Sequence, residues 1–206
     1  MRDINKALSD IGEIRTQIAA GTSFRGYGPV AIVITGIIGI ATAAAQSILA
    51  IHPGAAPALF VWSWVGAGLL SAAVVRIEMQ GRSRRHHSSL ADTMIAQAIG
   101  QFLPAAAACL FIPIFLLRFE PQVLWMMPGL WQLFVSLGIF ASVRTLPRNM
   151  MLVAGFYFVS AFASLMLAER HHDLSPWLMG VPFLGGQMLM AAILYFSAGE
   201  SDDDED

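Results

Sequence analysis

The dominant pattern along the chain is a series of long apolar stretches separated by short polar segments. A helix needs about 20 mainly apolar residues to cross a bilayer, because lipid offers its backbone no hydrogen-bond partners. Six stretches meet or approach this length, at residues 29–51, 57–75, 90–117, 128–143, 149–168 and 176–198. The pattern therefore predicts an all-α fold, an integral membrane bundle of six transmembrane helices with its transmembrane domain over residues 29–198.

The two ends of the chain have different patterns. Residues 1–24 carry a stripe of isoleucine, leucine and alanine opposite charged and amide residues, which predicts an amphipathic helix lying in the cytoplasmic interface. The alternative is a short heptad seam that pairs two copies in a homo-oligomer. Residues 199–206 hold six acidic side chains, and we expect them to form a disordered, solvated tail.

The composition supports membrane insertion and limits the chemistry. The 206 residues are 56% hydrophobic and 13% charged, with a mean hydropathy of +0.64, values that soluble domains of this size rarely show. The single cysteine, Cys109, lies inside an apolar stretch. It excludes an intramolecular disulfide framework and a thiolate metal cluster.

The basic residues are distributed unevenly between the two sides of the predicted bundle. Ten of the twelve Lys and Arg residues fall on one side, and only Arg118 and Arg170 fall on the other. Short basic segments are retained in the cytoplasm. With an even number of crossings, this predicts a multi-pass protein of the bacterial inner membrane with both termini cytoplasmic.

A basic cluster in "SRRHHSSLAD" joins the second and third predicted helices. It consists of Arg82, Arg84, Arg85, His86 and His87. The simplest interpretation is a loop that fixes topology and is followed by a helix cap at Ser88 or Ser89. The cluster could also bind an anionic lipid headgroup or a cytoplasmic protein partner. A metal or haem at the histidine pair is less favoured, because neighbouring helical side chains point about 100° apart.

A second polar cluster, in "AERHHDLSPW", follows the fifth predicted helix on the opposite side. Nitrogen and oxygen ligands for Zn²⁺ or Cu²⁺ could come from His52, Glu169, His171, His172 and Asp173. The alternative is a solvated loop, since no ligand spacing here is diagnostic. We predict no other cofactor.

The predicted spans lack the groups that membrane catalysts and proton carriers use. Asp, Glu, Lys, Arg and His all fall near helix ends or in loops, which disfavours proton-coupled transport. The chain has no GxSxG or HExxH motif and no glycine-rich nucleotide loop. The sequence therefore favours a protein that is not an enzyme.

Uncharged polar residues and prolines do occur within the spans. We predict a midplane pocket for a neutral or amphipathic molecule, lined by Gln97, Gln101, Pro104, Pro182 and Gln187. Gln101 and Gln187 each lie about eleven residues from the start of a predicted helix, which places them near the midplane at 1.5 Å per residue. Proline frees a carbonyl one turn earlier, and in lipid that carbonyl needs a partner. The alternative is hydrogen bonding between helices.

Three segments carry a resemblance to other proteins: "FRGYGPV", "SRRHHSSLADTMI" and "LWMMPGLWQLFVSLGIFASVRTLPRNMM". They resemble uncharacterised multi-spanning bacterial membrane proteins, which implies a bacterial inner membrane and no particular activity. The leading hypothesis is a non-catalytic binding, sensory or scaffold subunit with a basic cytoplasmic face. The alternatives are a carrier or channel-like facilitator and an extracytoplasmic metal-binding protein. The predicted partners are the lipid bilayer and an anionic lipid or cytoplasmic protein, with no nucleic acid.

Overall fold

The computed structural model describes residues 28–49, 56–86, 89–143, 149–170 and 174–203. Its helices are α2 (Pro29–Ile48), α3 (Pro57–His86), α4 (Ser89–Phe119), the 3-10 helix η1 (Pro121–Met126), α5 (Met127–Ser142), α6 (Met150–Glu169) and α7 (Trp177–Asp203). The predicted interfacial helix over residues 1–24 lies outside the described residues. The fold of the described part is all-α.

In the part of the chain that the structure describes, six helical segments are long and apolar enough to cross a membrane, the number that the sequence predicted. They are Pro29–Ile48, Pro57–Gly81, Ile99–Phe119, Pro121–Ser142, Met150–Glu169 and Trp177–Phe196. The fourth is longer than predicted, because η1 precedes α5 and adds six residues. A 3-10 helix rises about 2.0 Å per residue, so this short piece extends the span efficiently.

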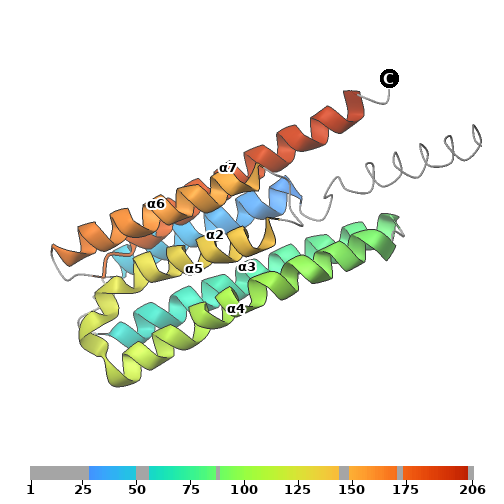
Figure 1. The fold of residues 1–206 in the computed structure, drawn as a ribbon. Helices are drawn as coiled ribbons and strands as arrows, with labels where there is room; N and C mark the ends of the chain where they lie inside the picture. Colours follow the sequence, from blue (N-terminus) through green and yellow to red (C-terminus); the bar gives the residue numbers. More distant parts are fainter. Residues whose placement is uncertain (1–27, 50–55, 87–88, 144–148, 171–173, 204–206) are drawn as a thin grey trace, which may run out of the picture.

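The spans run up and down, so that the start of α2 and the end of α7 lie at the same end of the bundle (Figure 1). The end of α3 and the start of α4 lie at that end too. We call it the hairpin end. Arg118 on α4 and Arg170 after α6 lie at the opposite end. This arrangement agrees with the even number of crossings predicted from the sequence.

Two helices extend further than the sequence analysis predicted. α3 continues to His86 and α4 begins at Ser89, so most of the predicted basic loop is helical. The reason is that "IEMQGRSRRH" contains no proline and only one glycine, and nothing in it interrupts the helix begun by the span. α7 likewise continues through the acidic segment as far as Asp203.

Four helices form the tightly packed part of the bundle. α2 packs extensively against α7, and α5 against α6. Glycines allow this close approach: a Cβ on Gly129 of α5 would lie 2.8 Å from the Ala161 carbonyl oxygen of α6, and a Cβ on Gly180 of α7 would lie 2.6 Å from the Ala43 Cβ of α2. Small residues at such contacts let dispersion forces replace the hydrophobic effect, which lipid does not supply.

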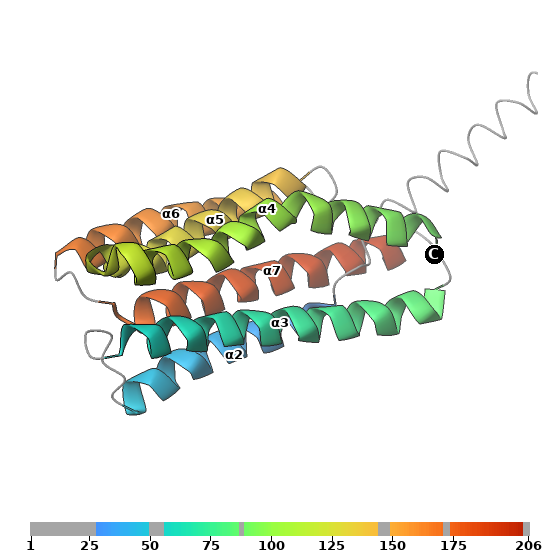
Figure 2. The same cartoon turned by 90° about the horizontal axis from the view of Figure 1, so that it is seen from below.

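The α3–α4 hairpin is attached differently. α3 and α4 are consecutive, yet few contacts join them, and they stand apart along much of their length (Figure 2). α3 is held chiefly by α2: the Gln46 side chain donates to the Phe60 carbonyl at 3.2 Å and accepts from Trp64 Nε1 at 3.0 Å. α4 packs on α5, where the Phe102 ring covers Gly138. The two arms of the hairpin are thus anchored to different neighbours.

Candidate functional site

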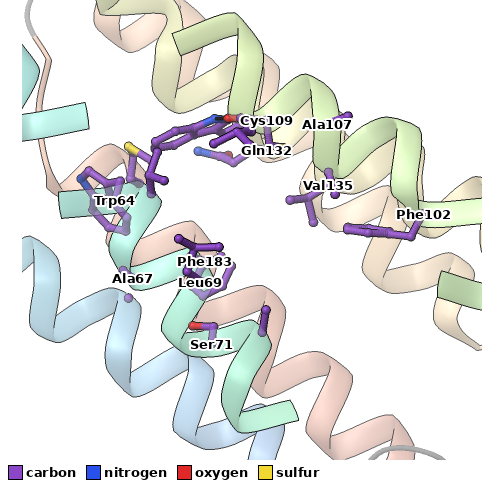
Figure 3. A pocket seen from close by; sticks show the side chains of 18 of the residues that line it. Trp64, Ala67, Leu69, Ser71, Phe102, Ala107, Cys109, Gln132, Val135 and Phe183 are labelled. Carbon is purple, nitrogen blue, oxygen red and sulfur yellow. Dashed lines mark hydrogen bonds between the residues drawn. The ribbon is translucent and has the colours of Figure 1, made fainter. Parts of the chain in front are cut away.

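A cavity of about 540 Å³ lies between the two arms of the hairpin. α3 and α4 form its walls, and its floor consists of α5 together with side chains from α6 and α7 and the backbone of Gly39 on α2. In Figure 3, Ala67, Leu69 and Ser71 of α3 lie across the cavity from Phe102 and Ala107 of α4. We call this cavity the lateral groove.

The lateral groove reaches the outer surface of the bundle. Leu69, Leu103 and Phe111 line it and are nevertheless 66%, 62% and 65% exposed. A side chain can satisfy both conditions only where the cavity opens outward. Because α3 and α4 are both candidate spans, the opening faces the lipid of a surrounding bilayer.

The two walls carry small residues, so their side chains do not fill the groove. Gly68 and Ala72 of α3 face Ala106 and Ala107 of α4 across it, and a Cβ added to Gly68 would meet no atom within 4 Å. In the predicted spans, small residues of this kind are expected to bring helices together. Here they leave a space, because each arm packs on a different partner.

Two adjacent residues of α5 complete hydrogen bonds that prolines break in the neighbouring helices. Pro113 cannot donate to the Cys109 carbonyl one turn earlier, and Trp131 Nε1 donates to that carbonyl at 2.7 Å. Pro182 leaves the Leu178 carbonyl without its helical donor in the same way. Gln132 Nε2 donates to it at 2.7 Å, so α5 bridges both interrupted helices.

These bonds explain why the lateral groove is apolar although Trp131 and Gln132 line it. Gln132 also donates to Ser164 Oγ at 3.0 Å, and its side-chain oxygen accepts from the same hydroxyl at 3.3 Å. The amide therefore has no unused donor pointing into the cavity. The groove offers a ligand mainly van der Waals contact, as most small-molecule sites do over much of their surface.

Ser71 is the polar exception in the wall. Its side chain is buried and lines the groove. Within the part of the chain that the structure describes, no hydrogen bond joins its hydroxyl to another group. A hydroxyl at membrane depth is satisfied more fully if a ligand in the groove supplies a partner.

Gln187 and Pro182, from the predicted midplane pocket, take part in contacts between helices. Gln187 Nε2 donates to the Tyr157 hydroxyl at 3.3 Å, and that hydroxyl donates to the Phe183 carbonyl at 3.2 Å. Pro182 frees the Leu178 carbonyl, which Gln132 satisfies. Neither Gln187 nor Pro182 lines the lateral groove.

The α4 members of the same prediction also lie away from the groove. Gln97 and Pro104 are exposed, and Gln101 is half-buried with its Oε1 atom unpaired. The position of Gln101 near the midplane stays a prediction.

The two other predicted clusters are only partly described. Arg82, Arg84, Arg85 and His86 lie in the last turns of α3, and His87 lies outside the described residues. Of the metal candidates, Glu169 is exposed at the end of α6, whereas His52, His171, His172 and Asp173 also lie outside them. Among the residues with described positions, no three His, Cys, Asp or Glu side chains are grouped so that they could hold a metal ion.

The sequence analysis missed Trp131 and Ser71. Trp131 has a recognisable signal, since a donor-bearing side chain and a proline in different spans form a natural pair in lipid. Ser71 has none, because one serine among alanines and valines is typical of any span. In comparisons with protein-family models, curated protein sequences and solved structures, nothing matches this chain.

Proposed function

We propose that this polytopic membrane protein is a non-catalytic binding protein for a lipid-like amphipathic molecule, which enters the lateral groove from the bilayer. A carrier would use the same site. The observation that carries the proposal is the groove itself, an apolar cavity of about 540 Å³ with exposed leucine and phenylalanine at its mouth. Small-molecule sites typically enclose about 300–1,000 Å³.

The dimensions of the groove suit a hydrocarbon chain. Its α4 wall runs from Phe102 to Phe111, which is about 14 Å at 1.5 Å per residue. A bilayer supplies such chains at the groove's mouth.

The test is photolabelling of the purified protein in nanodiscs with a phospholipid that carries a diazirine on its acyl chain. We expect labelled peptides to concentrate on the groove-lining parts of α3, α4 and α5. Ala106→Trp and Ala107→Trp place an indole in the groove and should reduce this labelling by about tenfold. Ala163→Trp is the matched control, since Ala163 is exposed on α6 and does not line the groove.

Thermal unfolding of each variant separates loss of binding from loss of fold. The proposal is wrong if the two groove variants keep their unfolding temperatures and label as strongly as the wild-type protein. It is equally wrong if wild-type labelling is spread evenly over all lipid-facing helices. A crosslink between two copies across the groove would instead identify a homo-oligomer interface.

A second candidate function uses the hairpin end. α3 continues to His86, so Arg82, Arg84 and Arg85 belong to its last turns. This concentration of basic residues supports a docking role toward an anionic membrane surface or a protein partner. Charge reversal of the three arginines should release such a partner, detected by co-purification, without lowering the unfolding temperature.

We further propose that the hairpin end is cytoplasmic and that the membrane is a bacterial inner membrane. The ten-to-two distribution of basic residues supports this orientation. Reporter fusions at residue 87 and at residue 206 should both indicate the cytoplasm. An external signal from either fusion would reverse the assignment.

A further inference from the structure

We infer that the lateral groove selects an anionic glycerophospholipid, with one acyl chain in the groove and the phosphate at Arg76. The inference rests on the proposed function and adds the class of ligand and the orientation in which it binds. Three observations carry it: the position of Arg76 just beyond the groove lining, its depth along the span, and the unpaired hydroxyl of Ser71.

Arg76 lies one helical turn beyond the last groove-lining residue of α3. It follows Ala72 by four residues and Leu69 by seven, and both of these line the groove. Residues with these spacings lie on one face of a helix. Arg76 is exposed, so its guanidinium is accessible just beyond the point where the apolar lining ends, on the hairpin side.

The depth of Arg76 matches that of a lipid headgroup. It is nineteen residues after Pro57, where the span begins, or about 29 Å at 1.5 Å per residue. The hydrocarbon core of a bilayer is about 30 Å thick. A phosphate beside Arg76 would therefore sit at the interface, while the chain below it lies at the level of the groove.

Ser71 lies between these two levels. It is five residues from Arg76, about 7.5 Å along the helix axis and about 140° around it, so the two side chains flank the groove from different sides of α3. No hydrogen bond joins the Ser71 hydroxyl to another described residue. In a glycerophospholipid the ester carbonyls lie between the phosphate and the chains. The Ser71 hydroxyl can donate to such a carbonyl, which gives the lipid a second polar contact.

Charge favours an anionic lipid over a zwitterionic one. Arg76 contributes a positive charge at the hairpin side of the groove, and no ion pair joins it to an acidic side chain whose position the structure describes. A guanidinium binds phosphate with two parallel hydrogen bonds. A choline headgroup would add a cation next to Arg76 and weaken the interaction, whereas a glycerol headgroup would not.

The experiment compares two photolabels with the same diazirine chain, phosphatidylglycerol and phosphatidylcholine, on the full chain in nanodiscs. One juxtamembrane arginine predicts that phosphatidylglycerol labels the groove about fivefold more than phosphatidylcholine. Arg76→Gln should reduce this ratio to about one, and Arg76→Lys should keep most of it. Arg118→Gln is the control, because Arg118 is exposed at the opposite end of α4, and it should leave the ratio unchanged.

Ser71→Ala should reduce labelling by both lipids about equally, because both carry ester carbonyls. The inference is overturned if Arg76→Gln keeps the fivefold ratio, or if inorganic phosphate competes with the lipid, since a free anion site needs no chain. In either case the groove still labels and the proposed function stands. If neither lipid labels the groove above the outer face of α6, the proposed function fails with it.

Discussion

Glycines have opposite environments in the two regions of this bundle. In the packed region, formed by α2, α5, α6 and α7, a Cβ on Gly186 would collide with the ring of Tyr157. In the α3–α4 hairpin, a Cβ on Gly66 or Gly68 would meet no atom within 4 Å. At these positions the same residue type fills a close contact in one region and leaves a space in the other. Both arrangements are stable in a bilayer, because lipid solvates an unpacked apolar helix face as well as a protein neighbour would.

The largest expected effect comes from adding a methyl group where α7 packs closely against α6. Gly186→Ala should destabilise the protein by about 3 kcal/mol, the upper part of the usual range for overpacking. Tyr157 is only 1% exposed and its hydroxyl is held by Phe183 and Gln187, so the ring cannot move aside cheaply. Equilibrium unfolding in mixed detergent micelles measures the change.

Gly155→Ala is the control within the packed region, because its Cβ would meet open space on α6. It should change the free energy of unfolding by less than about 1 kcal/mol. If Gly186→Ala is equally mild, α6 and α7 are less closely packed than the structure shows, and the contrast between the two regions weakens.

A smaller effect is expected from the α5 bridge. Gln132→Leu leaves the Leu178 carbonyl in an apolar interior without its nearest donor, because Pro182 cannot replace it. Ser164 Oγ is a second, longer donor to this carbonyl at 3.4 Å, so the loss lies in the lower part of the range of about 1–3 kcal/mol for an unsatisfied buried carbonyl. Bonds between membrane helices are often worth less than about 2 kcal/mol. We expect a loss of about 1.5 kcal/mol in the same unfolding measurement.

The proline provides a rescue for this variant. Pro182→Ala restores an N–H one turn after Leu178, so the double variant Gln132→Leu, Pro182→Ala should recover most of the loss. The interaction energy from the double-mutant cycle should be about 1 kcal/mol. Additive single effects would show that Gln132 contributes through packing alone. Trp131→Phe with Pro113→Ala repeats the test on α4.

More features of the packed region than of the hairpin could be predicted from the sequence. Hydrophobic length alone gave six spans, and the prolines correctly indicated carbonyls that need partners from other helices. The identity of the partners was out of reach, because a sequence does not say that α5 lies between α4 and α7. The Gln132 amide could equally have bonded any of several freed carbonyls.

The lateral groove was not predictable at all. The alanines of α4 favour close packing when they are read along one helix, and only the separate anchoring of α3 on α2 and of α4 on α5 turns them into a cavity wall.

The smallest expected effect has the opposite sign and tests the open region directly. Gly66→Ala replaces a flexible residue in the middle of α3 with the best helix former and adds a methyl group that touches nothing. It should stabilise the protein by up to about 1 kcal/mol, in the same assay in which Gly186→Ala destabilises it. Gly68→Ala should stabilise the protein by a similar amount, although its methyl group enters the lateral groove.

A loss of stability for Gly66→Ala would break the comparison, because it would mean that something covers this face of α3. The most direct occupant would be a second copy, since helices that associate in membranes bring glycines together. Crosslinking at increasing protein-to-lipid ratios would then show a dimer that Gly66→Ala dissociates. With stability gained and no dimer, the face remains exposed to lipid, as a groove that takes its ligand from the bilayer requires.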